Sequence, residues 1–323
     1  MIRKEIDELR KKQLEETNYL YSTNLQRKIF NPPNEEIHDF LCFWSDLLGF
    51  GNDLFKNNWD LGLDGFKKIR NRLLDAHNML ISNIDINHNT KGLILNDGIC
   101  QIMRCDYNIK EIDYISWLTK LGLYFLSCVK THIAINIIEK ENKYPGTRSV
   151  LAYGKGIKYL TDQITFDDFV FNYTKPDPEG ISTVAREIGN PIKLYNPSEL
   201  QMNTAFSKSY ILESLGSDYG ICGNELYIDK SVFDFISEYI KMSHTNAHFI
   251  EKDDCYQYLV PYELDDINKV YFGFKLSKKT VEIDYKDWKT TVYKVIAFYP
   301  HDEPIDEFEF DLYDYKENVW VTY

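Results

Sequence analysis

Apolar residues in the first half of the chain recur every three or four positions. This spacing is typical of helices that bury one face. The stripes occupy four segments, residues 2–29, 35–48, 62–83 and 112–138. Asn31-Pro32-Pro33-Asn34 separates the first two, because proline ends a helix and asparagine is a good N-cap. The pattern predicts a helical domain over residues 1–145, folded as an N-terminal bundle.

The second half has a different pattern. Tyr144-Pro145-Gly146 marks the predicted domain boundary, and helices are expected at 198–215 and 231–247. Short runs of β-branched and aromatic residues then follow, at 256–262, 270–276, 280–285, 291–299, 305–313 and 319–323. Turn residues separate these runs, which predicts an antiparallel β-meander. The predicted fold class is therefore α+β, with residues 146–323 forming an α+β domain that ends in this meander.

The segment between the third and fourth helical stripes allows two interpretations. Asn96-Asp97-Gly98 lies between two apolar runs, residues 93–95 and 99–103. These three residues favour a tight hairpin turn between two strands. A link between two helices is the alternative.

The composition is that of a folded, soluble protein. Hydrophobic residues make up 44% and aromatic residues 15% of the chain, well above the range of disordered proteins. Lys130 and His132 interrupt the most apolar run, residues 121–138, and the first residues lack the apolar core of a signal peptide. The six cysteines are scattered among apolar neighbours, as buried reduced thiols are. These features predict a cytoplasmic protein without a membrane segment.

The negative charge is concentrated in the second half. The chain has a formal net charge of −13, from 37 basic and 50 acidic residues. Residues 1–150 hold 20 of each sign, so residues 151–323 hold 17 basic and 30 acidic residues. Such a surface repels phosphate backbones and anionic membranes, so direct nucleic-acid binding by this half is not expected. It would attract a basic partner, although acidity that only maintains solubility is the alternative.

The acids are densest near the C-terminus. Phenylalanines alternate with acids in residues 307–311, and a period of two places the acids on one outward face of a strand. We predict that this acidic face binds a basic protein through Asp302, Glu303, Asp306, Glu307, Glu309, Asp311, Tyr313 and Asp314. A solvated face, partly neutralised by Lys289 and Lys294, is the alternative.

A second kind of function is suggested by Arg70, Arg72 and His77. An arginine separated from a histidine by four to six residues resembles the motif of the HEPN superfamily of helical ribonucleases, and both arginines have this spacing to His77. The resemblance implies that His77 acts as the acid–base group and that an arginine stabilises the charge on the phosphorus. The alternative is that His77 lies on the apolar stripe of its helix and the arginines are solvated.

Two further patterns were considered as ligand sites. His244 and His248 are four residues apart, a spacing that metal ligands use on a helix, but no glutamate accompanies them as in a metalloprotease. Gly216-Ser217, followed by Glu225 and Tyr227, faintly resembles a nucleotidyltransferase, but tyrosine stands where the second carboxylate belongs. No metal site and no cofactor are therefore expected.

The sequence thus favours a non-enzymatic binding protein. An inhibitor or immunity-type partner of a basic, nucleic-acid-directed toxin would match the acidic face. A HEPN-like, metal-independent ribonuclease is the alternative.

Overall fold

The computed structural model describes residues 37–84, 90–106, 114–157, 200, 202–241, 246–261, 270–300, 311–314 and 319–322. The chain divides into two compact units, one made of residues 38–155 and 203–323, the other of residues 1–37 and 156–202. The first unit contains nearly all the described residues, and the fold and site below belong to it.

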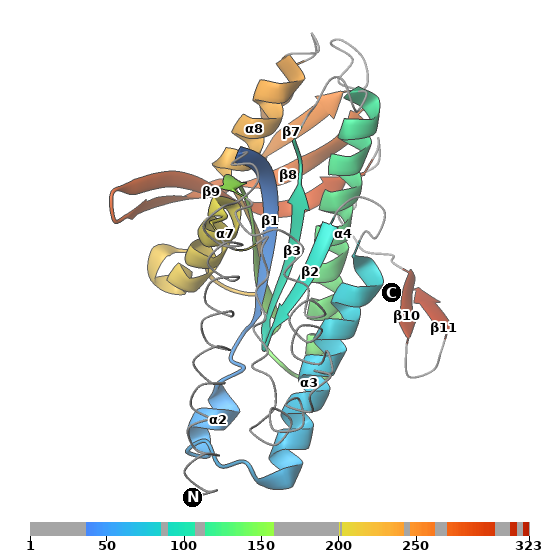
Figure 1. Ribbon diagram of the computed structural model, residues 1–323, viewed down its shortest axis with the longest axis vertical. Coiled ribbons are helices and arrows are strands. Elements are labelled where there is room, and N and C mark those ends of the chain that lie inside the picture. The colour runs from blue at the N-terminus through green and yellow to red at the C-terminus, as the bar shows by residue number, and fades with distance from the viewer. Residues whose placement is uncertain are drawn as a thin grey trace, which may run out of the picture. The chain divides into compact units, whose positions relative to one another are not determined.

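A nine-stranded mixed sheet is the centre of this unit (Figure 1), with the strand order β2-β3-β1-β4-β5-β9-β8-β7-β6. The strands are β1 Ile37–Leu47, β2 Thr90–Leu95, β3 Gly98–Arg104, β4 Thr147–Ile157, β5 Leu226–Asp229, β6 His248–Glu251, β7 Cys255–Pro261, β8 Val270–Tyr285 and β9 Trp288–Tyr299. The helical elements are α2 Asn52–Lys56, α3 Gly62–Asn83, α4 Tyr114–Glu141, α7 Thr204–Leu215, the 3₁₀ helix η1 Gly216–Tyr219 and α8 Lys230–Lys241.

The first four strands form a βαββαβ unit. β3 pairs antiparallel with both β1 and β2, and β1 lies between β3 and β4. Helices α2 and α3 connect β1 to β2, and α4 connects β3 to β4. This is the split arrangement in which the first strand of the chain becomes a central strand of the sheet.

The predicted N-terminal helical bundle is wrong. The segment expected as the second helix is the central strand β1, and residues 90–104 form a β-hairpin. The burial pattern gives the physical reason. Residues 40–45 are all buried because both faces of β1 are covered, and a continuous apolar run of this kind does not distinguish a buried helix from a buried strand.

The C-terminal region is not a simple antiparallel meander. Strands β6 to β9 are antiparallel neighbours, but β9 also pairs antiparallel with β5, and β5 pairs parallel with β4. The C-terminal strands β10 Asp311–Asp314 and β11 Val319–Thr322 pair only with each other within the described residues. The meander is therefore one edge of a larger mixed sheet, to which both halves of the sequence contribute strands.

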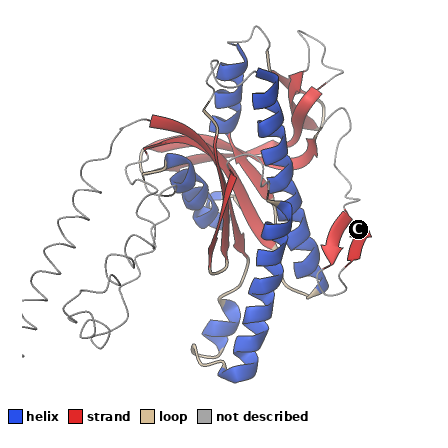
Figure 2. Ribbon diagram, turned by 45° about the vertical axis from the view of Figure 1, so that its right-hand side comes forward, coloured by secondary structure: helices blue, strands red, loops and turns tan. Residues whose placement is uncertain are grey.

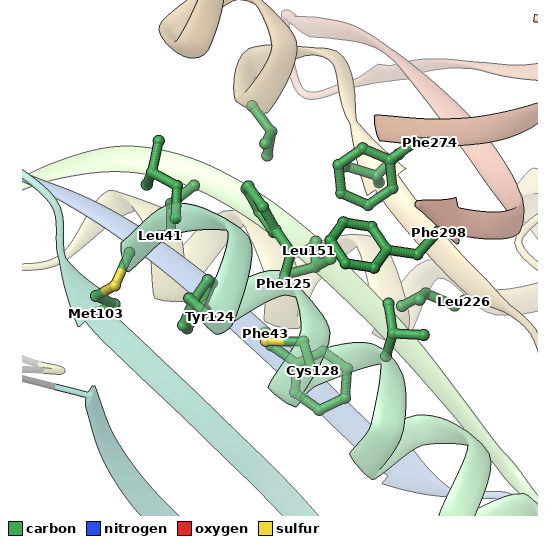
Figure 3. Packing of buried hydrophobic residues seen from close by; sticks show 14 of the residues in the cluster. Leu41, Phe43, Met103, Tyr124, Phe125, Cys128, Leu151, Leu226, Phe274 and Phe298 are labelled. Atoms are coloured by element: carbon green, nitrogen blue, oxygen red, sulfur yellow. The ribbon is translucent and has the colours of Figure 1, made fainter. Parts of the chain in front are cut away.

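The two faces of the sheet are covered by different helices. Residues of α3, α4 and α8 belong to one large apolar core. Figures 1 and 2 show the long helices α3 and α4 alongside the sheet. Phe125 of α4 packs at its centre (Figure 3), with its ring centroid 5.2 Å from that of Phe274 and 6.4 Å from that of Phe298. Helix α7 covers the other face, where Leu212 packs with Val150. Side chains of alternate β1 residues therefore meet different helices.

Helix α4 is long and apolar enough to cross a membrane by length and composition. Within the described part of the chain it is the single helix of this kind, and 61% of its most apolar window is buried inside the protein. This burial is what the core helix of a soluble protein shows.

Candidate functional site

Two carboxylates meet where β1 ends and the β2–β3 hairpin turns. Asp46 pairs with Gly98 in the β1–β3 ladder, and Asp97 is the preceding residue, in the two-residue turn after Leu95. The backbone N–H of Leu47 donates to the carbonyl of Asp97 over 3.3 Å. Side chains that are distant in sequence are thus adjacent through strand pairing.

The side chain of Asp46 lies on the face of the sheet that α7 covers. Cys42, four residues earlier on β1, accepts a hydrogen bond from Ser209 of α7, and the ring of Trp44 contacts that of Tyr210 at 5.3 Å. Alternate residues of a strand share a face, so Asp46 follows Cys42 and Trp44. Asp46 is partly exposed and Asp97 likewise.

The charge of Asp46 is poorly compensated. Burial, followed by the negative charges of Glu213 and Asp97, raises the pKa of Asp46 from 3.8 to about 7, against a smaller opposing effect of Arg148 and Arg72. Among the described residues, none donates a hydrogen bond to its carboxylate or forms an ion pair with it. Perturbed carboxylates without a partner are typical of functional sites, because structural acids are normally paired.

Glu213 and Arg148 form a fixed pair beside Asp46. The Nη2 atom of Arg148 lies 2.6 Å from Oε1 of Glu213 and also donates to the Glu213 carbonyl over 3.1 Å. Both side chains are largely buried. The pair holds α7 against β4 and keeps a guanidinium and a further carboxylate next to the Asp46–Asp97 pair.

A buried donor without a partner lies at the same place. Trp44 is only 4% exposed, and its buried Nε1 atom has no hydrogen-bond partner among the described residues. Its six-membered ring lies against Gly98, where a Cβ atom would come within 2.5 Å of Cη2. An unsatisfied buried N–H is rare in a native protein.

The loop after Asp46 is held by a buried ion pair. Arg72 of α3 donates from Nη2 to Glu139 Oε2 of α4 over 2.6 Å and to the Leu48 carbonyl over 2.9 Å. The Leu48 N–H donates to the carbonyl of Gly146 over 2.9 Å. The segment that follows Asp46 is therefore held by Arg72 of α3, which Glu139 of α4 fixes in place, and by Gly146 just before β4.

The hairpin that carries Asp97 is supported in the same way. The Nε2 atom of His77, in α3, lies 2.9 Å from the backbone carbonyl oxygen of Asn96. The side-chain amide of Asn96 donates a hydrogen bond to Oδ1 of Asp97 over 3.0 Å. Asn96 has a φ of 57°, the left-handed conformation that asparagine tolerates in tight turns. Helix α3 thus fixes both loops that carry the carboxylates.

This arrangement is suited to a divalent cation held together with a phosphate ligand. Among the residues that the structure describes, no three histidine, cysteine or acidic side chains are grouped to form a complete protein-only metal site. Magnesium is usually held by one or two carboxylates and completes its shell with water and substrate phosphates. Asp46 and Asp97 match that requirement in number and chemistry.

The residues of the predicted ribonuclease motif have other partners in this fold. Arg70 is exposed and bonds to Asn71, whereas Arg72 is buried against Glu139. His77 binds the hairpin, as described above. The helical fold that the resemblance implied is wrong, and the three residues do not share one open surface.

The other predicted sites are described only in part. The acidic face lies within residues 301–314, outside the residues whose side chains are described, so its partner stays a prediction. His244 also lies outside the described residues, and His248 belongs to strand β6 and not to a helix. Nε2 of His248 is buried without a hydrogen-bond partner.

The sequence pattern does not single out Asp46, and it indicates only a turn at Asp97. One signal was available, since Asp46 follows the apolar run 40–44 after a single serine, and the glycine-containing segment 49–51 comes next. Asp97 lies in a hairpin turn, and its position next to Asp46 follows only from the pairing of β3 with β1. No sequence pattern joins residues 46 and 97 without that pairing.

The comparisons with known proteins find only a remote likeness. No protein-family model matches the chain, and no curated protein does. The similar solved structures include the guanylyl cyclase Cya2 and the adenylyl cyclase CyaB from P. aeruginosa. Cya2 has a TM-score of 0.40 at 10% identity over 81% of this chain and 93% of its own. CyaB has a TM-score of 0.39 at 9% identity over 85% of this chain and 100% of its own.

Proposed function

We propose that this protein is an enzyme of metal-dependent phosphoryl or nucleotidyl transfer, with a nucleoside triphosphate as its substrate. The observation that carries the proposal is the Asp46–Asp97 pair, in which a partly buried acid without a partner lies next to a second acid. Asp46 and Asp97 would hold Mg²⁺, and the bound ion would neutralise charge on the substrate phosphates.

The surrounding residues support this assignment. Two unneutralised acids repel a phosphate unless a cation lies between them, so the pair suits a metal–phosphate complex and not a free anion. Arg148, held by Glu213, places a guanidinium beside the acids, and Arg72 and His77 keep the two supporting loops in place. Preorganisation of this kind is what positioning of a reactive phosphate requires.

Metal binding provides the first test. We expect wild-type protein to bind Mn²⁺, measured as loss of the free-ion signal in electron paramagnetic resonance, and Asp46→Asn or Asp97→Asn to weaken binding about tenfold or more. Asp60→Asn, an exposed acid between α2 and α3, is the matched control and should bind like wild type. Absence of Mn²⁺ binding, or equal affinity in all four proteins, would contradict the proposal.

The reaction is tested with the same variants. Wild-type protein, Mg²⁺ or Mn²⁺ and each of the four common nucleoside triphosphates are incubated, and the products are separated and identified by mass spectrometry. Cyclisation of adenylyl or guanylyl groups, which the names of the two similar structures specify for those proteins, is one reaction of this class. The assay therefore looks for cyclic nucleotides together with pyrophosphate and phosphate. The variant Asp46→Asn should form none of the products that the wild-type protein forms.

A further inference from the structure

A cavity lies on the face of the sheet that α4 covers, between α4, the loop before β4 and strands β5 and β9. Its volume is about 380 Å³. One wall is apolar and includes Val129 and Ile133 of α4 and Val295 of β9. The other end is polar and includes Lys140 and Asn224. This combination of an apolar body and a few polar groups is typical of small-molecule sites.

The charge at the polar end defines the ligand class. Glu225, which also lines the cavity, is neutralised by Lys294, whose Nζ atom lies 2.5 Å from Oε1. Lys140 is exposed, and no acid of the described chain pairs with it. The cavity therefore combines an apolar wall with one uncompensated cation, which is complementary to a small organic anion that has an apolar body.

A chain of hydrogen bonds also connects the cavity to the backbone of Asp46. Asn136 and His132 line it, and the Asn136 amide lies 3.1 Å from Nε2 of His132. From Nδ1 of His132 the chain runs through the hydroxyls of Ser149, Ser45 and Thr147, at 2.8, 2.9 and 2.6 Å for successive contacts.

The last hydroxyl in the chain reaches the candidate site. Thr147 Oγ1 donates to the carbonyl of Asp46 over 2.8 Å. Gly146, also in the cavity wall, accepts the Leu48 N–H that fixes the next loop. A side chain at Gly146 would collide with Asn136 and Asn224, so the cavity wall and the backbone of the site share the same closely packed residues.

We propose that this cavity is an effector site for a small amphipathic anion, such as a carboxylate or sulfonate with an apolar group, and that its occupancy changes the metal affinity of Asp46 and Asp97. The regulatory half of this inference rests on the proposed function, whereas the binding half does not. Coupling between two sites is reciprocal, so each ligand must change the affinity of the other by the same factor.

The probe is 8-anilinonaphthalene-1-sulfonate, whose fluorescence reports binding to apolar cavities. We expect saturable binding to the full-length protein and an affinity about tenfold lower for Lys140→Glu. Lys140→Arg and Lys143→Glu should bind the probe like wild type, because the first keeps the cation and the second changes an exposed lysine outside the cavity. Equal affinity in wild type and Lys140→Glu would overturn the site.

Coupling is measured by repeating the titration with saturating Mn²⁺. We expect the probe affinity of wild type to change about fivefold, the Mn²⁺ affinity to change by the same factor when the probe is saturating, and neither change in Asp46→Asn. Unchanged affinities in wild type that binds both ligands would overturn the regulatory half. Lack of Mn²⁺ binding with Lys140-dependent probe binding would instead overturn the proposed function and leave the effector site standing.

Discussion

Asp46 holds a negative charge where the fold compensates it only weakly. Burial and two neighbouring acids raise the pKa of its carboxyl group to about 7. An apolar or amide side chain at this position would avoid that cost, so the acid lowers the stability of the metal-free protein. A bound divalent cation would reverse the balance, because it supplies the missing positive charge.

Asp46→Asn should therefore stabilise the protein when no divalent ion is present. The folded-state pKa of about 7 lies above the ordinary value of 3.8, so wild-type stability increases as the pH falls from 7 towards 3.8. At pH 8 in EDTA, urea unfolding should show the variant to be more stable by about 1–2 kcal/mol, after allowance for partial exposure. The difference should shrink at pH 5, and a variant less stable than wild type at pH 8 would contradict the argument.

His132 should have the opposite dependence on pH. Burial lowers its pKa from 6.5 to about 3, and its ring accepts from Asn136 and donates to Ser149 as a neutral imidazole. Because the unfolded chain binds the proton more readily, stability decreases as the pH falls below 6.5, by about 2 kcal/mol between pH 7 and 5.

Asp46 and His132 change the stability in opposite directions between pH 7 and pH 5. The effect of His132 is therefore measured in proteins that lack the Asp46 carboxylate. Urea unfolding of Asp46→Asn and of the double variant Asp46→Asn/His132→Gln is followed at pH 7 and pH 5. The single variant should lose more stability than the double variant on acidification. Equal losses would show that His132 does not remain neutral in the folded state.

At the scale of elements, α3 contributes more to the candidate site than its sequence motif suggested. It donates Arg72 to the loop after β1 and His77 to the β2–β3 turn. The Arg72 guanidinium also lies 4.3 Å from the centroid of the Tyr144 ring. Two of the three residues that suggested catalysis, Arg72 and His77, thus hold the loops that carry the carboxylates.

Arg72→Ala and Arg70→Ala should differ strongly in stability. Removing Arg72 leaves Glu139 buried without its counter-charge, and loss of one partner of a buried pair costs about 3–5 kcal/mol. Arg70 is exposed two residues earlier, so its removal should change stability by less than about 0.5 kcal/mol. Chemical unfolding curves of both variants provide the test, and similar losses would contradict the assigned role of Arg72.

At the scale of the whole unit, one sheet and one core unite the two halves of the sequence. Strand β1 lies between β3 and β4, and Phe125 of α4 packs against Phe272, Phe274 and Phe298 from the C-terminal strands. The large apolar core contains residues from both sides of position 145. Stability of either half should therefore depend on the other.

A fragment of residues 38–145 should not fold alone. It lacks β4, which covers one edge of β1, and it lacks the phenylalanines of β8 and β9 that pack on α4. We expect no cooperative thermal transition in near-ultraviolet circular dichroism, whereas the full-length protein should show one. A cooperative transition in the fragment would show that the first half has a sufficient core of its own.

The sequence by itself determined those elements whose signals are local. The apolar stripes of residues 62–83 and 112–138 correspond to α3 and α4, and the turn at Asn96-Asp97-Gly98 is the hairpin, the first of the two interpretations that the sequence allowed. Each depends on helical periodicity or on turn chemistry within a few residues.

Only the tertiary structure decided the architecture and the site. Whether the run at 37–47 became a helix or a strand depended on partners at residues 98–104 and 147–157, because an apolar segment buried on both faces lacks a diagnostic period. The same pairing brings Asp46 next to Asp97 and lets burial raise the pKa of Asp46. Contacts between residues so far apart in the chain are properties of the folded sheet and not of any local pattern.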